Sequence, residues 1–317
     1  MAASHETFRE SLRGQTVTIP NIYHLLPEWK PRMHDEYQRA RDKVLNPWID
    51  RWVDDKRTAQ KLKAADFGVF AAVWGSSASF DVLCTAAKYF AWYFVYDDIF
   101  DCGALKHNTD VLQAYKEASL QYFKFVLIDE GEFPDLSAFD TELQKNLHSW
   151  DETREILCDE MLRFVGSLDN VDSIFSDGVP SLDQYWDRRE ATAGVFIYGV
   201  DVTREDVQAQ SMKDLFKHTS YFVHITNDMI SMRKEFNDGQ IENLIPVLML
   251  NRKIDCNMAM QQSYALAHHE AMGFRNVDLN HCNGSEERSN AVSQAFIQGC
   301  QDVAMGLAHW RYTSTSP

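Results

Sequence analysis

The stretch FAWYFVYDDIFD, residues 90–101, joins a run of aromatic side chains to three carboxylates. It contains neither glycine nor proline, and we predict a helix in which Asp97 and Asp101 lie one turn apart on one face. Carboxylates beside apolar surface repel one another and lose solvation, so the pattern favours a cation between them. Oxygen ligands of this kind select Mg²⁺ or Mn²⁺, whose remaining positions take water and phosphate oxygens. The stretch therefore indicates a phosphorylated ligand with an apolar body.

A second set of oxygen donors recurs every four residues in NDMISMRKE, residues 227–235. On a helix, Asn227, Ser231 and Glu235 fall on one stripe and offer an amide oxygen, a hydroxyl and a carboxylate. Such a stripe can also be a polar helix face with contacts between residues four apart. With a separate aspartate-rich motif upstream, it predicts a second metal site.

Together these residues resemble the class I terpene synthases, specifically the microbial sesquiterpene cyclases. Their aspartate-rich motif reads here as residues 97–101, and their Asn/Ser/Glu triad reads as residues 227, 231 and 235. Lys234 matches a lysine that contacts the diphosphate in many fungal members. Arg311 and Tyr312 match the family's Arg-Tyr pair, which also contacts diphosphate. The resemblance extends from about Phe67 to Tyr312.

The family also has an arginine upstream of the triad that senses diphosphate, followed by a helix break. The resemblance assigns the sensor to Arg189, with Thr192 as the linker and residues 193–194 as the break. The interval from Arg189 to Asn227 is somewhat shorter than the family usually shows. Arg188 is therefore an alternative, and either arginine could instead form an ordinary surface salt bridge.

The resemblance implies an Mg²⁺-dependent enzyme that binds a prenyl diphosphate. Asp97 is then the direct metal ligand of the first motif, and Asp101 is a weaker ligand or a partner of Arg and Lys. Three Mg²⁺ ions are expected, for which Mn²⁺ can substitute. Phe94 lies one turn before Asp97 and is assigned to the cavity wall, where an aromatic face stabilises a carbocation.

The reaction expected from the resemblance is ionisation of farnesyl diphosphate, loss of diphosphate and cyclisation to a sesquiterpene hydrocarbon or alcohol. Geranyl and geranylgeranyl diphosphate are alternative substrates. A chain-elongating prenyl transferase would carry a second aspartate-rich motif in place of residues 227–231, and a class II cyclase would need an Asp-x-Asp-Asp acid, which the sequence lacks. A non-catalytic helical isoprenoid-binding protein would explain the aromatics but not two separate oxygen stripes.

Composition narrows the class of partner. The formal charge of −16 would repel nucleic acid and anionic membranes, so neither is expected as a general partner. The six cysteines lack Cys-x-x-Cys spacing, which argues against a zinc site and favours a reducing compartment. The N-terminus has no apolar signal-peptide core, and no apolar run reaches membrane-spanning length. We expect a cytoplasmic protein, a monomer or a homodimer.

The chain reads as helix after helix, which predicts an all-α fold. We expect a polar, flexible lead over residues 1–20 and one domain over residues 21–317, an α-helical bundle around a central apolar cavity as in the class I terpenoid synthases. Ser181 is predicted as an N-cap, and residues 237–239 are predicted to end the triad helix. The predicted helices cover about 34–53 (kinked or split by Pro47), 58–73, 80–100, 110–127, 138–165, 182–198, 205–236, 241–250, 257–272 and 286–312.

Overall fold

A computed structural model of the chain describes residues 8, 10, 12–101, 108–148, 158–167, 180–192, 208–237, 242–277 and 286–313. Its elements are η1 (Ile22–Leu25), α2 (Tyr37–Ala40), η2 (Arg41–Leu45), α3 (Asn46–Trp52), α4 (Lys56–Ala65), α5 (Phe67–Trp74), α6 (Phe80–Asp101), α7 (Thr109–Ile128), α8 (Thr141–His148), α9 (Cys158–Ser167), α11 (Leu182–Thr192), α12 (Gln210–Asn237), α13 (Leu244–Arg252), α14 (Cys256–Arg275) and α15 (Glu286–Thr313).

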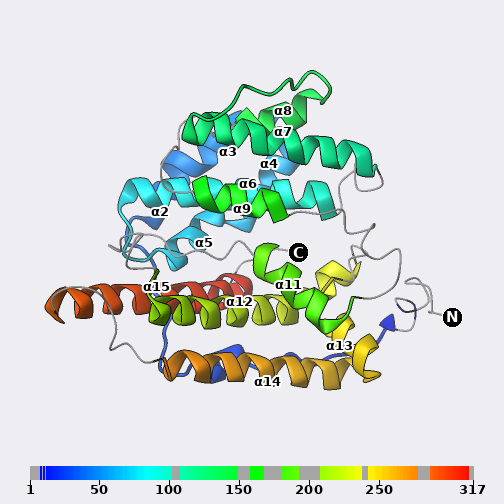
Figure 1. Cartoon of the computed structure of the whole chain (residues 1–317), viewed down its shortest axis with the longest axis vertical. Helices are drawn as coiled ribbons and strands as arrows, with labels where there is room; N and C mark the ends of the chain where they lie inside the picture. Colours follow the sequence, from blue (N-terminus) through cyan, green and yellow to red (C-terminus); the bar gives the residue numbers. More distant parts are fainter. Residues whose placement is uncertain are drawn as a thin grey trace.

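The fold is all-α, which confirms the predicted class. The long helices lie in successive layers, with α7 and α8 at one end, α6 and α9 next, then α12 with α15, and α14 at the other end (Figure 1). Helix α12 packs on α14 and α15, and α15 packs in turn on α5, which contacts α6. None of the helices in the described ranges is both long and apolar enough to cross a membrane.

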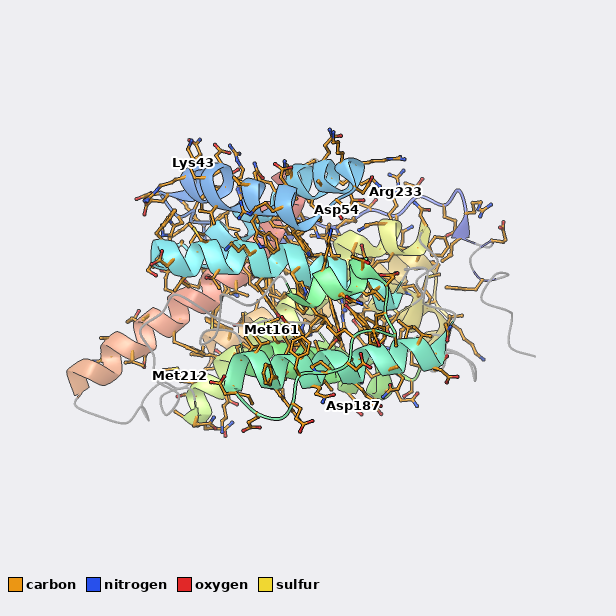
Figure 2. The ribbon with its side chains drawn as sticks, turned by 90° about the horizontal axis from the view of Figure 1, so that it is seen from above. Lys43, Asp54, Met161, Asp187, Met212 and Arg233 are labelled. Atoms are coloured by element: carbon orange, nitrogen blue, oxygen red, sulfur yellow. The ribbon has the colours of Figure 1, made fainter. Side chains whose placement is uncertain are left out.

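Helix α15 separates two hydrophobic cores. Val303, Leu307 and Trp310 join an aromatic core built mainly from α5, α6 and α7. Ala304 and Met305 join a second core with α12, α13 and α14. Side chains of the described residues extend into the space between the helices (Figure 2). Because its apolar residues face both ways, α15 must be buried along most of its length.

Helix α6 forms the centre of the aromatic core. The rings of Trp92 and Tyr96 stack at 4.8 Å, and Trp92 meets Phe123 of α7 edge to face at 5.5 Å. The indole nitrogen of Trp92 donates to the backbone oxygen of Asn146 at 2.9 Å, so this buried donor is satisfied. These contacts fix the orientation of α6 and hence of the aspartates at its C-terminal end.

The predicted helix over residues 58–73 is wrong in one respect, because it is two helices. Asp66 adopts a left-handed conformation with φ of 50° between α4 and α5. Its carboxylate accepts a hydrogen bond from Val69 N at 3.2 Å and another from the Tyr37 hydroxyl at 2.5 Å. An aspartate tolerates this conformation when its side chain is bonded locally, so tertiary contact with Tyr37 stabilises the break.

Other predicted boundaries are confirmed or shifted by capping residues. Ser181 caps α11, since its hydroxyl accepts from Gln184 N at 3.2 Å and Gln184 Oε1 accepts from Ser181 N at 2.9 Å. Helix α12 ends at Asn237 as predicted. Helix α13 begins only at Leu244, later than predicted, because Asn243 caps it. In the predicted helix 34–53, a π-helical turn precedes α3, where Pro47 sits in the first turn.

The predicted helix over 138–165 is represented by α8 and α9, and the residues between them lie outside the described part of the chain. Three cysteines, Cys84, Cys256 and Cys300, are buried free thiols. The proposed division into a lead and one domain stays a prediction.

Candidate active site

The polar stripe of α12 meets α15 at Asn227. Arg311, near the C-terminal end of α15, donates from Nη2 to Asn227 Oδ1 at 3.1 Å. Burial lowers the pKa of Arg311, and the Glu235 carboxylate opposes this shift. Ser231 is buried between Asn227 and Glu235 on the same stripe. The structure therefore brings a member of the predicted Arg-Tyr pair to two members of the predicted metal triad.

The two adjacent arginines of α11 have different partners. Arg189 donates from Nη2 to Asp228 Oδ1 at 2.5 Å, and Asp228 follows Asn227 directly on α12. Arg188 instead pairs with Glu242 at 2.9 Å. Burial lowers the pKa of Arg189, but Asp228, Tyr185, Glu235 and Glu242 together outweigh it and leave the pKa well above its ordinary value. Of the two candidates for the diphosphate sensor, Arg189 is the one that contacts the triad helix next to Asn227.

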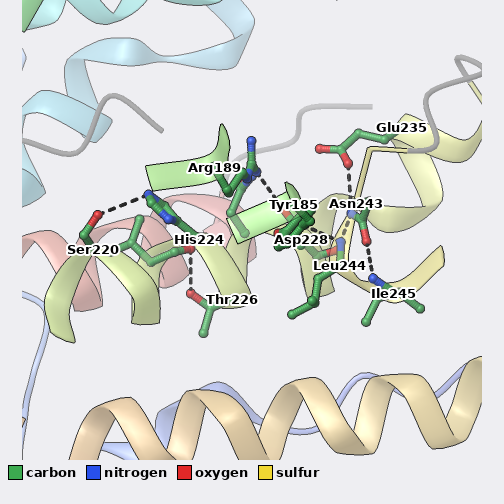
Figure 3. Close-up of polar contacts among 12 residues, drawn as sticks. Tyr185, Arg189, Ser220, His224, Thr226, Asp228, Glu235, Asn243, Leu244 and Ile245 are labelled. Atoms are coloured by element: carbon green, nitrogen blue, oxygen red, sulfur yellow. Dashed lines mark hydrogen bonds and ion pairs between the residues drawn. The ribbon is translucent and has the colours of Figure 1, made fainter. Parts of the chain in front are cut away.

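Asp228 is a residue of the candidate site that the sequence motifs do not single out. It is fully buried, and its carboxylate accepts from the Tyr185 hydroxyl at 2.5 Å and from Leu244 N at 2.6 Å, in addition to Arg189 (Figure 3). Asp228 lies one residue from Asn227 and therefore off the stripe of the triad. The only signal in the sequence is its place inside the motif.

Glu235 is held by the start of α13. Asn243 donates from Nδ2 to Glu235 Oε2 at 2.9 Å and to the backbone oxygen of Asp228 at 2.8 Å (Figure 3). Burial raises the pKa of Glu235, as does the Asp228 carboxylate, while Arg189 and Asn243 oppose the rise. The charged form of Glu235 is therefore destabilised, and a nearby positive charge would stabilise it. This agrees with a role as a metal ligand.

Two buried guanidinium nitrogens near the Asn227/Ser231/Glu235 stripe are available to donate a hydrogen bond to a ligand. Arg189 Nε and Arg311 Nε have no hydrogen-bond partner among the residues that the structure describes. A buried donor without an acceptor is costly, and a charged one is more so. Two cationic donors of this kind, beside the amide, hydroxyl and carboxylate oxygens of α12, fit a ligand that brings both metal ions and anionic oxygens.

The aromatic side of the site is built around Trp310, which precedes Arg311. Phe94 of α6 packs against the Trp310 ring at 5.7 Å and against Phe67 at 5.0 Å. The Trp310 indole donates to Ala65 O at 2.9 Å, and the Arg311 guanidinium carbon lies 4.9 Å from the centre of its ring. Phe94 is half-buried in this stack. An apolar aromatic wall thus continues directly into a cationic side chain.

The remaining predicted residues are placed as follows. Asp97 is half-buried on α6, whereas Asp98 and Lys234 are exposed. Asp101, Thr192 and Tyr312 lie within helices, but their side chains are outside the described part of the structure, as are residues 193–194. Within the described residues, no group of three or more His, Cys, Asp or Glu side chains could hold a metal ion. The predicted ligand set depends instead on Asn and Ser oxygens as well as carboxylates.

Comparison with known proteins gives the class of this chain. Residues 88–271 match the model of "Terpene synthase family 2, C-terminal metal binding". The sesquiterpene cyclase hepA of Aspergillus oryzae is 22% identical, with 97% of this chain and 90% of that protein covered. The (+)-germacrene D synthase of Selaginella moellendorffii is 23% identical, with coverage of 95% and 90%.

Solved structures share the fold. Hedycaryol synthase, in complex with HEPES, superposes with a TM-score of 0.71 at 15% identity, and the alignment covers 94% of this chain and 100% of that one. A crystal structure of α-eudesmol synthase gives a TM-score of 0.70 at 16% identity, with coverage of 95% and 99%.

The family match spans more than half of the chain, and the chain therefore belongs to terpene synthase family 2. It is an enzyme of the terpene synthase and cyclase class with the all-α terpenoid synthase fold, as the sequence motifs predicted. The matched region is that of a metal-binding domain, which indicates a divalent metal cofactor.

Proposed function

We propose that this enzyme is a class I sesquiterpene synthase that ionises farnesyl diphosphate in an Mg²⁺-dependent reaction and cyclises the cation to a hydrocarbon or alcohol. The observation that carries the proposal is the pair of half-buried arginines, Arg189 and Arg311, bonded to adjacent residues of α12. Relatives named sesquiterpene cyclase and germacrene D synthase support a substrate with fifteen carbons.

The metal-binding part of the site is assigned by the chemistry of its donors. The oxygen ligands that would hold Mg²⁺ are Asp97, Asp101, Asn227, Ser231 and Glu235. Ions held there would supply positive charge that lowers the barrier to departure of the diphosphate. The neighbouring Arg311 donates to Asn227 Oδ1, and an amide oxygen has two lone pairs, so the same oxygen can serve both partners.

The arginines orient and stabilise the leaving group. Breaking the allylic C–O bond concentrates negative charge on the diphosphate, and Arg189 and Arg311 present planar donors that keep their charge in a buried site. Lys234 and Tyr312 are proposed to add further contacts to the diphosphate. Because these donors are fixed by the packing of α11 and α15 on α12, little reorganisation is needed when charge develops.

The aromatic side of the site is proposed to stabilise the carbocation and to shield it from water. Phe94 is proposed to present a ring face, which stabilises positive charge by about 0.5 to 2 kcal/mol per contact without acting as a nucleophile. Water would quench an allylic cation, so closely packed rings also serve by excluding it. The shape of this aromatic wall is then expected to decide how the cation folds before it is deprotonated or hydrated.

The experiment is incubation of the full chain with farnesyl, geranyl or geranylgeranyl diphosphate and Mg²⁺, followed by gas chromatography and mass spectrometry of the extract. A C15 product from farnesyl diphosphate, lost with EDTA and restored by Mg²⁺, is the expected result. A C10 or C20 product would move the proposal to another substrate. A longer diphosphate would indicate chain elongation, and unchanged substrate would indicate a binding role.

A further inference from the structure

The buried Asp228 carboxylate joins three helices at the polar end of α12. It accepts hydrogen bonds from Arg189 and Tyr185 of α11 and from the backbone of Leu244 at the start of α13. A fully buried carboxylate is costly unless its charge is paired and its oxygens are bonded. Both oxygens of Asp228 meet this condition, so the carboxylate itself is satisfied and has a defined geometry.

The contacts of Asp228 determine the orientation of the Arg189 guanidinium. Its Nη2 atom is used by Asp228, whereas its Nε has no hydrogen-bond partner among the described residues. An arginine has five N–H donors in a rigid plane, so one strong ion pair fixes the plane and leaves other donors for a ligand. The adjacent Arg188 has its own carboxylate partner, Glu242. Asp228 therefore distinguishes two arginines that are equivalent in the sequence pattern.

The same residue is linked to Glu235. Asn243 bridges the backbone oxygen of Asp228 and the Glu235 carboxylate, while its own Oδ1 accepts from Ile245 N at 2.9 Å. Leu244 N, next to Asn243, donates to the Asp228 carboxylate. A shift of Asp228 would therefore displace the start of α13 and, with it, the amide that bonds Glu235.

We propose that Asp228 is a positioning residue that holds the Arg189 guanidinium in place for the diphosphate and keeps the start of α13 against Glu235. This inference rests on the proposed function, because it assumes that the ligand of Arg189 is a diphosphate. Asp228 carries a negative charge near an anionic ligand, yet the Arg189 ion pair and two further donors compensate that charge. Its contribution is geometric, and it acts through Arg189.

The test is isothermal titration of the full chain with inorganic pyrophosphate in the presence of Mg²⁺. Asp228→Asn keeps the shape of the side chain but loses the charge that pairs with Arg189. We expect it to weaken pyrophosphate binding about tenfold or more. In a chain that already carries Arg189→Gln, the same Asp228→Asn change is expected to have little further effect, because the residue through which it acts is gone.

Asp302 offers a matched control. It is also a buried carboxylate paired with an arginine, Arg32 at 2.8 Å, and it accepts from Ser76 at 2.6 Å. Asp302→Asn is expected to lower the melting temperature while leaving pyrophosphate affinity at the wild-type value. A loss of affinity in this control would mean that general destabilisation explains the Asp228 result, and the inference would be overturned.

Tyr185→Phe is the second variant, to be used if Asp228→Asn does not fold by circular dichroism. It removes one donor to Asp228 and leaves Arg189 intact, so a smaller loss of affinity is expected, again absent in the Arg189→Gln background. Unchanged affinity, or equal losses in both backgrounds, would overturn the inference. If the wild-type chain fails to bind pyrophosphate with Mg²⁺, the result counts against the proposed function itself. If the wild type binds and Asp228→Asn binds equally well, only the role of Asp228 is refuted.

Discussion

Arg311 donates a hydrogen bond from Nη2 to Asn227 Oδ1 across 3.1 Å, joining residues separated by 84 positions in the chain. The bond ties the last helix to the first residue of the predicted metal triad. It also places a half-buried cation at the N-terminal end of the triad, opposite the end where Asn243 holds Glu235. Both ends of the triad are therefore bonded to other helices or their caps before any ligand arrives.

Replacement of Asn227 is the first prediction. We expect Asn227→Ala to abolish turnover, by more than about 100-fold, because it removes a proposed metal ligand and the partner of Arg311 together. Product formation at saturating Mg²⁺ is the measurement. Asn251→Ala is the control, since Asn251 also makes two hydrogen bonds, to Pro180 O and Val247 O, but lies outside the site. Near-normal turnover by Asn227→Ala would remove it from the triad.

Local periodicity is sufficient to predict the helices that carry the motifs. Helix α6 was expected over residues 80–100 and runs over Phe80–Asp101, because an apolar stretch without glycine or proline has no local reason to stop earlier. The triad stripe on α12 follows from the same rule. The break at Asp66 was not predicted, since it depends on a hydrogen bond from Tyr37, which is 29 positions away.

The partners of the site residues could not be predicted in the same way. Asp228 is bonded by Tyr185, 43 positions upstream, and by Leu244, 16 positions downstream. No periodicity links these positions, because α11 and α13 reach α12 only through tertiary packing. The sequence left Arg188 and Arg189 as alternatives for the same reason. In the structure, Arg189 pairs with the buried Asp228 carboxylate beside Asn227, and Arg188 pairs with Glu242.

Phe94 gives the second prediction, which concerns product specificity. Phe94→Ala removes a ring that packs on Phe67 and Trp310, and we expect ionisation to continue while the product mixture changes. The ratio of products by gas chromatography is the measurement. Phe123→Leu serves as the control, because Phe123 is buried against Trp92 in the core between α6 and α7. An unchanged product profile in Phe94→Ala would exclude Phe94 from the cavity wall.

The third prediction tests the contact between α12 and α14. A Cβ atom on Gly273 would lie 2.6 Å from His218 Nδ1, which also meets Glu270 Oε2 at 2.8 Å. Gly273→Ala must therefore displace His218, and we expect it to lower the free energy of unfolding by about 1 to 3 kcal/mol in urea denaturation. Gly166→Ala is the control, since a Cβ there meets nothing within 4 Å. It should be neutral or stabilising by up to about 1 kcal/mol.

The final prediction concerns alkaline pH. Tyr37 donates to Asp66 and accepts from Arg41 Nη1 at 2.6 Å, and burial, followed by the effect of Asp66, raises its pKa to about 12. Between the ordinary value of about 10 and this value, the unfolded chain loses the proton while the folded chain keeps it. The stabilisation from neutral Tyr37 is thus complete below pH 10 and is lost as the pH rises toward 12.

Tyr37→Phe cannot ionise, so the stability difference between wild type and Tyr37→Phe should shrink steadily above pH 10. Free energies of unfolding from urea denaturation, measured for both proteins at several pH values on either side of pH 10, give this difference directly. Burial also raises the pKa of Tyr96, Tyr115 and Tyr185, but these residues are common to both proteins and cancel in the comparison. If the difference in free energy of unfolding between the two proteins stays constant across pH 10, the loss of stability at alkaline pH is not due to Tyr37.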